Sequence, residues 1–97
     1  MYGTVARLHV KPGSDARFNE LTSSFGSLHV PGFVATYLYQ TDAGSNEYYL
    51  AVVFDSKASY TANAESPEQN DRFLEMRELL AGDPEWHDGE ITSSSLA

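Results

Sequence analysis

The longest apolar segment of the chain is Glu47–Phe54, which reads EYYLAVVF and has the pattern of a buried strand. Alternate residues of a strand point to opposite faces of its sheet, and here both sets are apolar. One set is Tyr48, Leu50, Val52 and Phe54, and the other is Tyr49, Ala51 and Val53. A strand with one face in water would alternate between apolar and polar side chains. We therefore expect this strand to be covered on both faces.

Three further segments have strand patterns. Tyr2–Val10 alternates and stops at Lys11-Pro12-Gly13, because proline lacks an amide hydrogen and glycine permits a turn. Phe33–Gln40 is followed by Thr41–Asn46, which consists of turn-forming residues. This spacing predicts a hairpin between Phe33–Gln40 and the long apolar strand. Glu85–Thr92 is the last strand candidate.

A first helix is predicted after the opening strand. Ser14 stands where a helix cap would, and Asp15 follows it in the first turn, where the helix dipole favours a negative charge. Apolar residues then recur at helical spacing, at Phe18, Leu21, Phe25 and Leu28. The end of this helix is expected to fray, since it contains small, weakly helix-forming residues, Ser23, Ser24 and Gly26.

The second helical region has two parts. Ser56–Ala64 is predicted as a short helix. Ser66-Pro67-Glu68-Gln69 has the features of a helix start, with a serine cap, a proline in the first turn and a glutamine three residues after the cap. We expect Glu68 and Arg72 to form an ion pair four residues apart on the helix surface, and Gly82 to end the helix.

The predicted element order is βαββαβ, which is the ferredoxin-like pattern of one antiparallel sheet with two helices on a single face. In this α+β topology Glu47–Phe54 occupies a central position of the sheet. The two helices cover one face only, which leaves the other as a large apolar surface. We therefore expect a homodimer in which the bare sheet faces pack together.

Length and composition allow one domain and exclude several classes of partner. With 97 residues, we expect one domain over residues 1–92 and a disordered tail over residues 93–97. The formal charge of −8 disfavours nucleic acid and anionic membranes as partners. No apolar run is long enough for a membrane span, and the chain enters a strand pattern directly after Met1, so we expect no signal peptide. The lack of cysteine is consistent with a cytoplasmic protein and excludes thiolate chemistry.

The sequence carries no motif for a metal or a nucleotide. The histidines, His9, His29 and His87, lack the spacing of a metal site. The glycines lie in separate turns rather than in a phosphate-binding loop, and the G-x-S-x-G elbow of serine hydrolases is absent. We expect neither a metal nor another cofactor.

Three segments together resemble the antibiotic biosynthesis monooxygenase family. They are Val10-Lys11-Pro12-Gly13, Val30-Pro31-Gly32-Phe33 and the stretch from Asp83 to Ile91, DPEWHDGEI. The resemblance extends over residues 2–92, and it is the order and spacing of the three segments that carries it. It implies a dimeric α+β barrel with a substrate cleft between the helices and the sheet. Some members of the family oxidise aromatic polyketides or quinols with dioxygen and no cofactor, and others degrade haem.

Trp86-His87-Asp88 is the most suggestive polar cluster. On a strand, Trp86 and Asp88 share one face and His87 points to the other, so the three cannot form a local catalytic triad. His87 is a candidate general base for a phenolic proton, because its ordinary pKa of about 6.5 suits proton transfer near neutrality. The alternative is a histidine hydrogen-bonded at the edge of the dimer. Trp86 is a candidate for stacking on a flat aromatic ligand, or else fills the core or the interface.

The resemblance implies further site residues near the second helical region, which lines the cleft in the family. Asn63 and Arg72 would stabilise an enolate or peroxide anion, and Tyr60 would hold a substrate hydroxyl. The alternative is that all three are ordinary surface residues of an amphipathic helix. Aromatic residues of the sheet, Tyr37, Tyr48 and Tyr49, are candidates to line the cavity or, more simply, to fill the core.

Two departures from the family narrow the expected activity. Haem-degrading members use a histidine on the second long helix, and Pro67–Ala81 contains none. Quinone-forming members have an asparagine and a tryptophan near the substrate, whereas here Asn63 is a loose match and the single tryptophan is in the last strand. The leading hypothesis is a cofactor-independent monooxygenase of a small aromatic such as a quinol, a naphthol or a polyketide-like compound. The alternative is a non-catalytic dimer that binds a small apolar ligand or acts as an interaction module.

Overall fold

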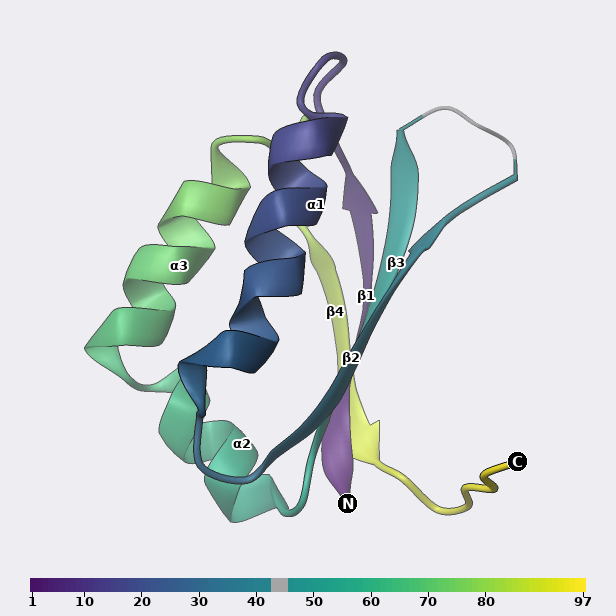
Figure 1. Cartoon of the computed structure of the whole chain (residues 1–97), viewed down its shortest axis with the longest axis vertical. Coiled ribbons are helices and arrows are strands. Elements are labelled where there is room, and N and C mark those ends of the chain that lie inside the picture. Colours follow the sequence, from purple (N-terminus) through teal and green to yellow (C-terminus); the bar gives the residue numbers. More distant parts are fainter. Residues whose placement is uncertain (43–45) are drawn as a thin grey trace.

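The computed structural model describes residues 1–42 and 46–97 and contains one four-stranded antiparallel sheet with all helices on one face (Figure 1). The strands are β1 (Tyr2–His9), β2 (Phe33–Gln40), β3 (Glu47–Phe54) and β4 (Glu85–Glu90), in the spatial order β2-β3-β1-β4. The ferredoxin-like α+β fold expected from the sequence is confirmed, with β3 and β1 in the centre. The turn predicted over residues 41–46 falls partly outside the described residues.

The helices are α1 (Asp15–Ser23), the 3-10 helix η1 (Ser24–Leu28), α2 (Lys57–Ala64) and α3 (Pro67–Arg77). The two predicted parts of the second helical region are therefore both present. Each starts at a serine cap: the Ser56 hydroxyl accepts a hydrogen bond from the amide of Ser59, and that of Ser66 from the amide of Gln69. These caps fix where α2 and α3 begin, with a short connection between them.

The end of the first helical region, where fraying was predicted, forms the 3-10 helix η1. The hydroxyls of Ser23, Ser24 and Ser27 each donate a hydrogen bond to the carbonyl three residues earlier, at 3.1, 2.8 and 2.7 Å. Serine hydroxyls compete with the backbone for carbonyls in this way, which favours the tighter turn. The segment η1 consequently holds Phe25 over the sheet, where its ring lies 4.8 Å from that of Phe33.

The end of α3 was also predicted incorrectly, since the helix stops at Arg77 rather than at Gly82. The residues that follow pair with the end of β1 instead. The amide of Lys11 donates to the carbonyl of Leu79 at 2.8 Å, and the amide of Ala81 donates to the carbonyl of His9 at 2.7 Å. These long-range hydrogen bonds replace the last helical turn and direct the chain into β4.

The core lies between α1 and the helix-covered face of β1 and β3. Its fully buried members include Ala6, Leu8, Phe18 and Tyr48. The Tyr48 hydroxyl donates a hydrogen bond to Oδ2 of Asp15 at 2.5 Å. Burial, and then the contact with the Asp15 carboxylate, raise the pKa of Tyr48. Tyr48 thus ties the start of α1 to the sheet.

The opposite face of the sheet, which we call the open face, has no cover within the described part of the chain. Its exposed apolar side chains are Val5, Tyr37, Tyr39 and Tyr49. A register shift between Phe33 and Ala35 turns Phe33 toward the helices and leaves Ala35, Tyr37 and Tyr39 on the open face. Both faces of β3 are apolar, as predicted, and only one is covered by the helices. None of the helices in residues 1–42 and 46–97 is long and apolar enough to cross a membrane.

Candidate functional site

A cavity of about 590 Å³ lies between the helices and the covered face of the sheet. This volume is in the range of small-molecule sites, which is roughly 300–1,000 Å³. Its floor comes from β1, β2 and β3, and its walls come from α1, η1, α2, α3 and β4. Most of the lining is apolar or aromatic, and includes Phe25, Leu50, Val52, Phe54, Phe73 and Trp86.

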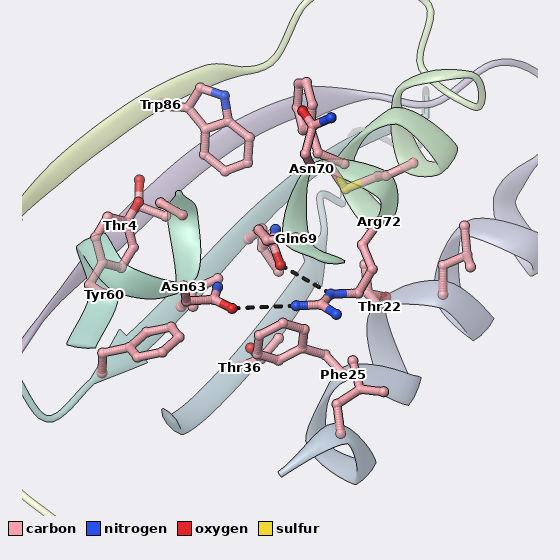
Figure 2. Close-up of a pocket in the computed structure, with 18 of the residues that line it drawn as sticks. Thr4, Thr22, Phe25, Thr36, Tyr60, Asn63, Gln69, Asn70, Arg72 and Trp86 are labelled. Atoms are coloured by element: carbon pink, nitrogen blue, oxygen red, sulfur yellow. Dashed lines mark hydrogen bonds between the residues drawn. The ribbon is translucent and has the colours of Figure 1, made fainter. Parts of the chain in front are cut away.

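Arg72 and its partners form the main polar cluster of the cavity (Figure 2). The Arg72 Nε donates to Oε1 of Gln69 at 3.1 Å, and Nη2 donates to Oδ1 of Asn63 at 3.3 Å. Arginine has donors only, so the amide of Asn63 must present its oxygen to the guanidinium. This contact leaves the NH₂ group of Asn63 as a donor for another partner.

Arg72 does not make the surface ion pair with Glu68 that helical spacing predicts. The ion pairs within the described residues do not include it, and the guanidinium instead lies 5.4 Å from the centre of the Phe25 ring. Packing on an aromatic ring suits a planar, weakly hydrated cation. Arg72 therefore turns from the helix surface toward the cavity, held by neutral partners.

Tyr60 and Asp88 form a second polar pair on the lining. The Tyr60 hydroxyl donates to Oδ1 of Asp88 at 2.9 Å, and its ring packs edge-on against Tyr2 and Phe54. Burial, and then the hydrogen bond and charge of Asp88, raise the pKa of Tyr60 to about 12. The Thr4 hydroxyl beside Tyr60 lowers this pKa by a smaller amount. The two hydroxyls do not form a hydrogen bond of normal geometry. Tyr60 is thus a neutral phenol at physiological pH.

Two threonines of the cavity floor have buried hydroxyl oxygens without a partner in the described structure, Thr4 and Thr36. Both are registered opposite Val52, Thr4 from β1 and Thr36 from β2, so the three side chains form a row across the sheet. An unpaired buried hydroxyl costs about 1–3 kcal/mol. The floor of the cavity therefore contains unused hydrogen-bonding capacity.

The structure brings together four of the residues singled out in the sequence. Asn63, Tyr60, Arg72 and Trp86 all line the cavity. Trp86 comes from β4 and is 41% exposed, with its ring 6.2 Å from that of Phe73. Trp86 therefore stands at the accessible side of the cavity.

The other four candidate residues lie outside the cavity lining. His87 is on the open face, as its alternation with Trp86 and Asp88 predicts. Its Nε2 lies 2.9 Å from Oε1 of Glu85. Tyr37 and Tyr49 are also on the open face. Tyr48 does face the helices, but it is buried in the core under α1, outside the cavity lining.

Sequence reasoning assigned no site role to Gln69, Asp88, Thr4 or Thr36, which also line the cavity. Gln69 precedes Arg72 by three residues, a spacing that puts both on one face of a helix. The alternation of β4 likewise put Asp88 beside Trp86. Nothing in the sequence distinguishes Thr4 and Thr36 from other strand threonines.

Within residues 1–42 and 46–97, no group of three or more histidine, aspartate or glutamate side chains is arranged to hold a metal ion. The polar groups that the cavity does offer are amides, hydroxyls, one guanidinium and carboxylates. Such a set can bind and orient an aromatic ligand that carries oxygen substituents.

The profile of the antibiotic biosynthesis monooxygenase family matches residues 1–76 of the sequence. The chain belongs to this family. The matched part contains β1 to β3, α1, α2 and most of α3, and hence Asn63, Tyr60 and Arg72. No curated protein matches the sequence.

Solved structures share the fold of this family member over nearly its whole length. SnoaB, a cofactor-independent oxygenase from Streptomyces nogalater solved as an asparagine-to-alanine mutant, has a TM-score of 0.82 at 19% identity, covering 96% of this chain and 94% of SnoaB. A protein from Chloroflexus aurantiacus J-10-fl, provisionally given the family's name, has a TM-score of 0.78 at 22% identity, covering 97% and 95%. A conserved protein from Methanosarcina mazei Go1 has a TM-score of 0.78 at 20% identity, covering 91% and 89%.

Proposed function

We propose that this protein is a cofactor-independent monooxygenase that oxidises a small, electron-rich aromatic such as a quinol or naphthol with dioxygen. The observation that carries the proposal is an aromatic-lined cavity containing the amide of Asn63, fixed in orientation by Arg72. Membership of the antibiotic biosynthesis monooxygenase family supports it. The description of SnoaB as a cofactor-independent oxygenase is consistent with it.

The reaction needs little from the protein, because the substrate supplies the electrons. For a naphthol with hydrogen at the para carbon, one dioxygen is consumed. One of its oxygen atoms becomes the new quinone oxygen, and the other leaves as water with the phenolic and para hydrogens. The first step is ionisation of the phenol, which makes the ring electron-rich enough to reduce dioxygen. In the proposed mechanism, the free NH₂ donor of Asn63, held in orientation by Arg72, stabilises the phenolate oxygen.

Tyr60 and Asp88, on the other side of the cavity, are proposed to position the substrate and to accept its proton. Tyr60 stays protonated and orients a substrate oxygen, while the Asp88 carboxylate beside it takes up the phenolic proton. Glu75 also lines the cavity, but its carboxylate is engaged with Arg17 at 2.6 Å. The apolar walls exclude water, which strengthens the hydrogen bonds to the developing anion.

The proposal is tested with a panel of hydroquinones and naphthols under air and under argon. Oxygen uptake above the uncatalysed rate is expected with the wild-type protein, and its loss in Asn63→Ala. Asn70→Ala removes another amide from the cavity lining and should retain the uptake. Absence of enzyme-dependent oxygen uptake across the panel would refute the proposal.

A second candidate function is binding without catalysis. It is favoured by the position of His87, the histidine predicted as a general base, on the open face rather than in the cavity. In that case aromatic ligands would quench the fluorescence of Trp86, the single tryptophan, with no oxygen consumption.

The proposal includes a homodimer formed through the open face. Val5, Tyr37 and Tyr39 are 51%, 56% and 57% exposed there, an unusual concentration for a monomer. A second copy would bury them, and the twofold arrangement leaves the cavity on the other face accessible. A cytoplasmic location, expected from the absence of cysteine, belongs to the same proposal.

A further inference from the structure

Arg72 carries a positive charge that no carboxylate in the described part of the chain neutralises. The other arginines with described contacts, Arg7, Arg17 and Arg77, each have an acidic partner within 2.8 Å. Arg72 has two amide oxygens and an aromatic ring. In a chain with 14 acidic residues against 6 basic ones, an arginine without an acidic partner is notable.

The guanidinium is also held in one orientation. Of its five N–H groups, Gln69 and Asn63 engage two. The Phe25 ring supports it. A fixed guanidinium with further donors available matches the planar geometry of a carboxylate.

The charges of the cavity have a direction. Asp88 is bound to Tyr60, and Figure 2 shows Tyr60 and Arg72 on opposite sides of Asn63. A ligand with an anionic group at one end would place it at Arg72, away from the Asp88 carboxylate. The other carboxylate of the lining, Glu75, is already paired with Arg17. The aromatic side chains of the cavity lining would contact its ring.

We propose that the substrate is an aromatic monocarboxylate, whose carboxylate binds Arg72 and whose ring occupies the aromatic-lined cavity. This inference rests on the proposed function only in taking the cavity as the substrate site. A monoanion is favoured over a phosphate because the lining contains one arginine and two carboxylates, Asp88 and Glu75. A dianion would meet greater repulsion from these carboxylates.

Calorimetric titration with 2-naphthoate and its neutral analogue 2-naphthamide tests this inference. Neither probe needs to be oxidised. The wild-type protein should bind the carboxylate at least about tenfold more tightly than the amide, as a charge-assisted hydrogen bond provides. In Arg72→Met this ratio should fall to about one. Arg72→Lys should keep part of the preference, since it restores the charge without the planar fork.

The matched control is Arg77→Met on the same helix, because Arg77 pairs with Asp83 and lies outside the cavity lining. It should keep the full preference. Equal affinities in the wild-type protein, no binding of 2-naphthoate, or a preference that survives Arg72→Met would each overturn the inference. The result is independent of oxygen chemistry: a preference lost in Arg72→Met without oxygen uptake would support the carboxylate site and contradict the oxygenase.

Discussion

Arg72 and Asn63 are joined across the connection between α3 and α2, with Nη2 of Arg72 donating to Oδ1 of Asn63 at 3.3 Å. The contact links the charge of one helix to the amide orientation of the other. It also turns Oδ1 of Asn63 toward the guanidinium, which leaves the NH₂ group of Asn63 to donate to a ligand. The proposed chemistry depends on this orientation.

Replacing Asn63 by aspartate tests that dependence with little change in shape. Asn63→Asp removes the NH₂ donor and gives Arg72 a carboxylate partner. We expect turnover to fall about 10²–10³-fold, as for the loss of an oxyanion donor, with no loss of folding stability. The measurements are kcat/KM by oxygen uptake and unfolding in urea. Asn70→Asp adds the same charge at another lining residue, and an equal loss there would contradict a specific role for Asn63.

His87→Ala is expected to leave turnover within about twofold of wild type, because an exposed residue away from the site has small effects. His87 is 62% exposed on the open face, next to Glu85. Steady-state oxygen uptake provides the measurement. A large decrease in a variant that remains folded and keeps the wild-type oligomeric state would show that His87 takes part in the reaction after all.

The parts of the fold that depend on local residue patterns, such as strand alternation and helix capping, could be predicted from the sequence. Alternation in Glu47–Phe54 showed that both faces are apolar, and the serine cap at Ser66 located the start of α3. The end of α3 could not be predicted, because the hydrogen bonds that stop it come from the end of β1, far away in the sequence. The shift near Phe33 was missed for a similar reason, since a bulge depends on the partner strand.

In the candidate site, too, local patterns were predicted correctly and tertiary contacts were not. Alternation separated His87 from Trp86 and Asp88 correctly. Helical spacing alone predicted that Arg72 would pair with Glu68, because that rule considers one helix in isolation. In the folded chain, α2 provides Asn63 and η1 provides Phe25, and these tertiary contacts turn the guanidinium toward the cavity.

The raised pKa of Tyr60 predicts a loss of stability at high pH. Its value of about 12 lies above the ordinary value of 10.0, so the folded state retains a proton that the unfolded chain releases. The resulting stabilisation is complete below pH 10 and is lost as the pH rises toward 12. In Tyr60→Phe, the free energy of unfolding should fall less across this window, as measured by urea titrations. Asp88→Asn should reduce this loss of stability in part, because the carboxylate is one of the causes of the raised pKa of Tyr60. Parallel curves of unfolding free energy against pH for wild type and Tyr60→Phe would contradict the prediction.

A charge in the middle of the open face should separate the proposed dimer. Val53 belongs to the open face of β3, and Val53→Glu would place two like charges in an apolar interface. Light scattering should give twice the chain mass for the wild-type protein and the chain mass for the variant. Leu74→Glu adds the same charge to an exposed position on α3 and should remain dimeric. A monomeric wild-type protein that binds no apolar dye would exclude the dimer.

The most direct test of the monooxygenase proposal is the origin of the oxygen atom in the product. The purified protein, freed of metal by a chelator, is incubated with a naphthol under ¹⁸O₂ in ordinary water, and the quinone is analysed by mass spectrometry. We predict enzyme-dependent formation of quinone with one ¹⁸O atom per molecule, strongly reduced in Asn63→Asp. Quinone without ¹⁸O under conditions in which exchange with water is negligible, or no enzyme-dependent quinone, would contradict a monooxygenase.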